Sequence, residues 1–149
     1  MTDIRFYHLT RGGLDEVLPR LLERTLQAGK RAVVMLGSPE RVEALNAHLW
    51  TYEEASFLPH GCARDGKSER QPVWLTTAEE NPNGATFLFV ADGASVARPE
   101  SWERVSEIFD GGDDEAVTAA RVRWKAYRDA GHGLEYWQQG EQGGWEKKA

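Results

Sequence analysis

Two short, continuously apolar runs constrain the fold of this chain more than any other feature. They span residues 31–36 (RAVVML) and 86–91 (TFLFVA). Such runs are typical of strands that are buried on both faces, because a strand with one wet face alternates apolar and polar residues. Both runs are far too short to span a membrane. We therefore expect these strands inside a sheet that helices cover.

Helix and strand patterns alternate around these runs, which predicts an α/β fold with a mainly parallel sheet flanked by helices. With 149 residues the chain has the length of one ordinary domain, and we expect that domain over 1–137, with a loosely structured tail over 138–149. We predict the remaining strands over 4–9, 73–77 and 104–109, the last at a sheet edge, and helices over 14–28, 40–52 and 113–130.

Composition excludes several classes of protein. The formal net charge of −6 and the pI near 5.3 argue against a protein that binds nucleic acid over its whole surface. Cys62 is the one cysteine, which excludes an internal disulfide, and we find no signal-peptide pattern. A reducing, cytoplasmic location fits these features best.

The predicted helix over 113–130 concentrates positive charge in the stretch ARVRWKAYRDAG. At about 100° per residue, one quarter of the helix surface should point away from the sheet, and small residues together with Arg123 and Tyr127 should face it. The outward quarter contains Val117, Arg121, Trp124, Lys125 and Arg128.

Three explanations of this basic quarter remain open. Cations near a helix C-terminus suit the helix dipole, which explains the charges but not the large indole of Trp124 among them. An aromatic side chain next to cations can also bind an acidic peptide that carries an apolar anchor, which is the second explanation. The third is binding of single-stranded DNA. The acidity of the whole chain favours the peptide.

The segment GCARDGKS over 61–68 has the spacing of a phosphate-binding P-loop, and Lys67, Ser68 and Asp92 would be its functional residues. A working P-loop must enter a helix, but Pro72 and the strand that follows leave no room for one. His60 and Cys62 form a lone pair without a third metal ligand. We expect no metal, no cofactor and no catalytic residue.

Trp50 and Phe57 lie on either side of TYEEAS, after the second predicted helix. Large aromatic side chains are mostly buried, so one or both of them belong more often to the core than to the surface. If both are exposed, they form a contact patch for another protein.

Several motifs taken together resemble the chi subunit of bacterial DNA polymerase III holoenzyme. The resemblance is strongest in RWKAYR with AG, at 123–128 and 130–131, and it extends to IRFYHL, HLW and SFLPH. It implies an α/β fold that is similar to nucleotide-binding sheets but has no working nucleotide site. It also implies a noncatalytic clamp-loader accessory that grips the acidic C-terminal tail of single-stranded-DNA-binding protein.

The resemblance places the family's tail-binding arginine on Arg121, its pocket aromatic on Trp124 and its adjacent lysine on Lys125. In this ungapped comparison Val117 replaces a basic residue of the family, and Asp110 replaces an apolar pocket residue. The chain therefore lacks part of the family's pocket pattern.

Arg128 is a candidate for the missing charge in that pocket. The surface around Trp50 and Phe57 resembles the family's contact with the psi subunit, and the clamp loader or a helicase is the alternative partner there.

Overall fold

The sheet has the apolar runs at its centre, as predicted. The computed structural model describes residues 2–11, 13–51, 60–62, 66–141 and 144–149. Within these residues one eight-stranded sheet has the strand order β3-β4-β2-β5-β6-β1-β7-β8. The elements in chain order are β1 (Asp3–Leu9), α1 (Leu14–Gln27), β2 (Ala32–Met35), α2 (Pro39–Thr51), β3 (Gly61–Cys62), β4 (Val73–Thr76), β5 (Phe87–Val90), β6 (Arg104–Asp110), α3 (Asp114–Asp129), β7 (Gly133–Gln139) and β8 (Trp145–Lys147), with short 3₁₀ turns at Ser68–Arg70 and Pro99–Ser101.

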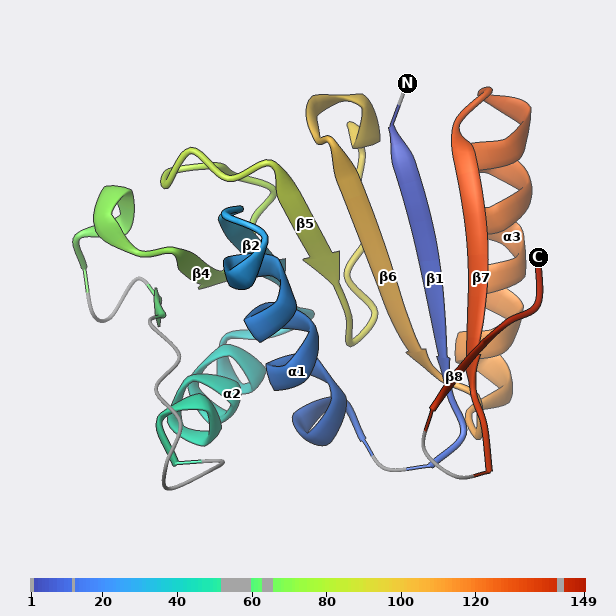
Figure 1. Cartoon of the computed structure of the whole chain (residues 1–149), viewed down its shortest axis with the longest axis horizontal. Helices are drawn as coiled ribbons and strands as arrows, with labels where there is room; N and C mark the ends of the chain where they lie inside the picture. Colours follow the sequence, from blue (N-terminus) through green and yellow to red (C-terminus); the bar gives the residue numbers. More distant parts are fainter. Residues whose placement is uncertain (1, 12, 52–59, 63–65, 142–143) are drawn as a thin grey trace.

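The strands from β3 to β7 pair in parallel, and β8 alone pairs antiparallel, with β7. Figure 1 shows α1 and α2 on one face of the sheet and α3 on the other. This arrangement confirms the predicted α/β fold with a mainly parallel sheet flanked by helices. None of the helices in the described ranges is long and apolar enough to cross a membrane.

The two apolar runs form β2 and β5, which are neighbours, and every residue of both strands is buried. Their side chains alternate between two hydrophobic cores, one on each face of the sheet. The core on the α1 face includes Val34 and Phe89, and the core on the α3 face includes Val33 and Leu88. A strand in this position has no wet face, so its sequence carries no polar alternation.

The ends of α3 follow from its flanking residues. Asp113 caps the first turn, because its carboxylate accepts hydrogen bonds from the backbone N–H groups of Glu115 at 3.0 Å and Ala116 at 3.3 Å. At the other end Gly131 has a φ of 87°, a left-handed conformation that favours glycine, and the N–H of His132 bonds back to the carbonyl of Tyr127. The helix therefore has fixed ends and a fixed rotation over the sheet.

Two features of the sheet differ from the sequence predictions. The strand over 104–109 was predicted at an edge, which is wrong: β6 lies between β5 and β1. Its charged residues are compatible with this inner position because Arg104 pairs with Asp3 and Glu107 pairs with Arg123. The segment 138–149, expected to be loosely structured, includes the end of β7 and all of β8.

Candidate functional site

The outer surface of α3 carries the basic residues that the sequence singled out. Arg121, Lys125 and Arg128 are all exposed. Arg128 lies 3.7 Å from the carboxylate of its neighbour Asp129, and both side chains are about 60% exposed, so this pair contributes little to stability. Neither Arg121 nor Lys125 forms an ion pair within the described ranges. These two cations, one helical turn apart, are available to an anionic partner.

The position of Trp124 corrects the angular prediction. Its indole was expected to face outward, but it is only partly exposed and packs edge-on against Phe6 at 5.4 Å and Tyr136 at 5.8 Å between ring centroids. Val117 packs beside the same core. The face that α3 turns to the sheet is thus rotated toward Val117 and Trp124, because these two residues offer more apolar area than the small residues predicted there.

The small-residue side of α3 is buried only in part. Ala120 and Tyr127 are buried and Ala116 and Arg123 are half-buried, but Ala119 and Ala130, which were also expected against the sheet, are exposed.

Arg123 is not part of the exposed basic surface. Its Nε donates to the Glu107 carboxylate at 2.6 Å, and the Tyr127 hydroxyl donates to the same oxygen at 3.2 Å. Glu107 is 1% exposed. Burial raises the pKa of this carboxyl, and the charge of Arg123 opposes that shift. Arg123 therefore serves the fold, since it balances a buried charge under α3.

His8 and Tyr136 join the predicted residues where α3 meets β1 and β7. The His8 Nδ1 and the Tyr136 hydroxyl are 2.6 Å apart. Burial lowers the pKa of His8 and raises the pKa of Tyr136, and the nearby charge of Arg121 acts to lower both. The sequence patterns did not single out His8 as a site residue. The missed signal is strand alternation, which puts His8 on the same face as Ile4 and Phe6. We call His8 and Tyr136, together with Val117, Arg121, Trp124, Lys125 and Arg128, the α3–β7 surface.

Asp110, which aligns with an apolar pocket position in the sequence comparison, ends β6. Its carboxylate accepts a hydrogen bond from the N–H of Gly112 at 2.8 Å. This bond shapes the turn into α3, so Asp110 supplies a polar turn where the family's pattern has an apolar contact.

A cavity of about 620 Å³ lies where β1, β5 and β6 end, the position at which parallel α/β sheets commonly bind ligands. Its cations are already paired: Arg123 holds Glu107, and Arg41 holds Asp92 at 2.7 Å and Asp15 at 3.2 Å. The first turn of α3 is occupied by the Asp113 cap. A phosphate group bound here would lie near more carboxylates than cations, and both of these cations already pair with carboxylates.

The P-loop pattern does not form a phosphate cradle in the described residues. Ser68 starts a single 3₁₀ turn of three residues, which agrees with the expectation that no helix follows. The pattern starts at β3, whereas Asp92 follows β5, three strand positions away in the sheet and thus roughly 14 Å across. Asp92 also bonds to Arg41. The residues Lys67, Ser68 and Asp92 are therefore not assembled around a common ligand.

The other predicted sites are covered only in part. Trp50 lies in α2 and Phe57 follows it, but the side chain of Trp50 and the whole of Phe57 lie outside the described residues. The structure therefore does not test the second predicted interface. Among the residues that the structure does describe, no group of three or more His, Cys, Asp or Glu side chains is arranged to hold a metal ion.

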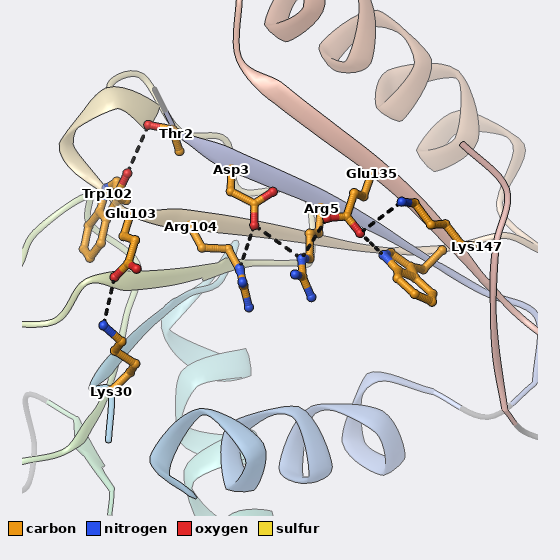
Figure 2. Close-up of polar contacts among 10 residues, drawn as sticks. Thr2, Asp3, Arg5, Lys30, Trp102, Glu103, Arg104, Glu135 and Lys147 are labelled. Carbon is orange, nitrogen blue, oxygen red and sulfur yellow. Dashed lines mark hydrogen bonds and ion pairs between the residues drawn. The ribbon is translucent and has the colours of Figure 1, made fainter. Parts of the chain in front are cut away.

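The opposite face of the sheet carries a different set of charges. Figure 2 shows ion pairs that run across neighbouring strands, from Arg104 through Asp3 and Arg5 to Glu135 and Lys147. Their nitrogen–oxygen distances lie between 3.0 Å for Arg104 and Asp3 and 3.8 Å for Lys147 and Glu135. Every cation of this set, which we call the charge ladder, has an acidic partner.

Comparison with known proteins identifies the family. The model of the DNA polymerase III chi subunit, HolC, matches residues 1–135. The chain belongs to the DNA polymerase III chi subunit family. The match includes β1, α3 and the start of β7, and with them all but one residue of the α3–β7 surface, since Tyr136 follows the matched range. The predicted family resemblance is thereby confirmed.

Two chi relatives show how far the similarity extends. The chain is 29% identical over 98 residues to the probable DNA polymerase III subunit chi of Rickettsia prowazekii (strain Madrid E), which covers 66% of this chain and 59% of that protein. It is 24% identical over 123 residues to the DNA polymerase III subunit chi of Escherichia coli (strain K12), which covers 81% and 82%. The chain thus spans less than two thirds of the Rickettsia protein.

Proposed function

We propose that this protein is a noncatalytic accessory subunit of DNA polymerase III in the cytoplasm. In this role it links the clamp loader to single-stranded-DNA-binding protein during DNA replication, by binding that protein's acidic C-terminal tail. The observation that carries the proposal is the pair of exposed cations Arg121 and Lys125, which form no ion pair within the described residues and lie beside the partly exposed Trp124. Family membership supports the replicase as its place of action.

The chemistry of the α3–β7 surface suits such a tail better than a nucleic acid. A short acidic peptide needs two or three cations and one apolar contact, which Arg121, Lys125, Arg128 and the exposed edge of Trp124 provide. Single-stranded DNA binding relies on bases that stack on aromatic faces and on a longer basic track. Trp124 instead uses much of its surface to pack on Phe6 and Tyr136, and the chain as a whole is acidic.

A second contact completes the linking role. We assign it to the surface around Trp50 and Phe57, with the psi subunit or the clamp loader itself as the partner. The support is the family resemblance of these two positions, because the structure does not describe their side chains.

Fluorescence-anisotropy titration of a labelled acidic peptide tests the tail-binding role. The peptide copies the tail of the host's single-stranded-DNA-binding protein. We expect saturable binding at low salt, and we expect Arg121→Ala to weaken it about tenfold, or about 1.4 kcal/mol. The matched control is Arg20→Ala, which removes an exposed cation from α1.

Two outcomes contradict the proposal. One is a wild-type protein that does not bind the peptide at low salt. The other is an equal loss of affinity in Arg121→Ala and Arg20→Ala, because that would mean that net charge alone drives binding. A labelled oligothymidine titrated in parallel reports direct DNA binding, which should be weaker than peptide binding.

A further inference from the structure

His8 lies in a half-buried position on the α3 face of β1. Its ring packs against Phe109 at 5.0 Å and Tyr136 at 5.9 Å between centroids, and its Nδ1 shares a hydrogen bond with the Tyr136 hydroxyl. Gly111 closes over the other side of the ring, where any larger residue would collide with it. The imidazole is therefore held in one place, with its Nδ1 committed to Tyr136.

The charges that face His8 come from three elements. Arg121 approaches from α3, Asp110 from the end of β6, and the Tyr136 hydroxyl from β7. Burial and the charge of Arg121 lower the pKa of His8, and Asp110 partly offsets this effect. In the free protein at pH 7 the ring is therefore mostly neutral.

An acidic ligand next to Arg121 changes this balance. A carboxylate that pairs with Arg121 cancels the positive charge that disfavours protonation of His8, and it adds a negative charge that favours it. Whenever His8 is protonated, Nδ1 carries a hydrogen and donates to the Tyr136 oxygen, so the Tyr136 hydroxyl can donate to the ligand. The hydrogen-bonded pair thus becomes a second donor group beside Arg121.

We propose that His8 and Tyr136 are part of the peptide-binding surface and that His8 takes up a proton when an acidic peptide binds beside Arg121. This inference rests on the proposed function and adds to it a contact from the sheet and a dependence on pH. Neither residue was among the predicted tail-binding positions, which all lie on α3.

The sign of the pH dependence follows from proton uptake. The bound complex holds His8 with a higher pKa than the free protein, so binding gains free energy as the pH falls through the interval between these two values. Above the bound-state pKa the gain is absent, and below the free-state pKa it is complete. The carboxylates of the peptide stay ionised down to about pH 5.5, so they do not obscure the effect.

The test is the same anisotropy titration, carried out between pH 8 and pH 5.5 at constant ionic strength. Wild type should bind about three- to tenfold more tightly at the lower pH, since a pKa difference of one unit allows at most tenfold. His8→Asn keeps a polar partner for Tyr136 but cannot take up the proton, and its affinity should not vary with pH. His132→Asn, which changes a histidine after the C-terminus of α3, should keep the wild-type slope.

Two results overturn the inference. The first is a His8→Asn variant that keeps the wild-type pH slope. The second is an NMR titration of the His8 ring in wild type that gives the same pKa with and without peptide, which needs no variant to fold. Peptide binding with no pH slope rejects this inference alone, whereas absence of binding at every pH rejects the proposed function. Tyr136→Phe should weaken binding at pH 5.5 more than at pH 8.

Discussion

The two faces of the sheet differ in whether their cations pair with carboxylates. On the α1 face the charge ladder neutralises Arg5, Arg104 and Lys147 with acids on adjacent strands (Figure 2). On the α3 face Arg121 and Lys125 have no ion pair within the described residues. Paired cations contribute to strand register and surface solubility, while unpaired cations can gain from a ligand. Pairing, more than the number of charges, therefore separates the proposed binding surface from the charge ladder.

Breaking the ion pair between Arg123 and the buried Glu107 under α3 should have the largest effect. Arg123→Ala leaves Glu107 buried without its cation, and we expect the free energy of unfolding to fall by about 3 kcal/mol. The pKa of Glu107 should then rise further, so the folded state binds a proton that the unfolded state releases. Stability of the variant should therefore decrease as the pH rises from 5 to 8, which urea denaturation followed by circular dichroism can measure.

The control for this prediction is Arg128→Ala, which removes an exposed cation from the same helix. Its cost should stay below about 0.5 kcal/mol, because the pair with Asp129 is exposed to solvent. If Arg123→Ala were no more destabilising than Arg128→Ala, the buried pair would not be the structural element that we describe.

Trp124 belongs to both the core and the α3–β7 surface, which gives the next prediction. Trp124→Ala should lower the free energy of unfolding by about 2 kcal/mol, through loss of its contacts with Phe6 and Tyr136, and should also weaken peptide binding. Arg121→Ala should weaken binding with little change in stability. Thermal unfolding and anisotropy on both variants separate the two roles. A Trp124→Ala protein of wild-type stability would restore the outward orientation that the helical angles predicted.

The strands β2 and β5 and the helix α3 show what the sequence could and could not predict. The buried strands β2 and β5 were predictable because a strand without a wet face has an uninterrupted apolar run. The helix α3 was predictable from its acidic start and from Gly131. Its rotation was not, because an ideal helical wheel gives the angles between residues but not which direction faces the sheet.

The missed elements had weaker local signals. All seven residues of β7 are half-buried, so GLEYWQQ has neither an apolar run nor a clean alternation. The inner position of β6 was obscured by Arg104 and Glu107, whose partners Asp3 and Arg123 come from distant parts of the chain. Likewise, the meeting of His8 with Tyr136 depends on the pairing of β1 with β7, which no short stretch of sequence contains.

Salt should weaken peptide binding more than it changes stability, and this effect should be smaller than those of the substitutions above. Raising the ionic strength from about 0.05 M to 0.5 M should weaken peptide binding about fivefold, or about 1 kcal/mol, because the steering charges of Arg121 and Lys125 are exposed and screened. The free energy of unfolding should change less over the same range, since the side chains of the ladder pairs are partly shielded from solvent. Anisotropy and urea denaturation at matched salt concentrations give both numbers. A salt-independent affinity would contradict the electrostatic part of the proposed function.

The smallest effect is expected within the charge ladder. A double-mutant cycle on Asp3→Asn and Arg104→Gln should give a coupling energy of about 0.5 kcal/mol, because the 3.0 Å pair joins two side chains that are each about one third exposed. Arg104 also lies 4.7 Å over the Phe87 ring, so its single substitution costs more than the pair alone. The cycle removes that term, since the Phe87 contact is lost equally with and without Asp3. Neither variant should alter peptide affinity, and a change of threefold or more would place the ladder face in the binding surface and break the distinction between the two faces.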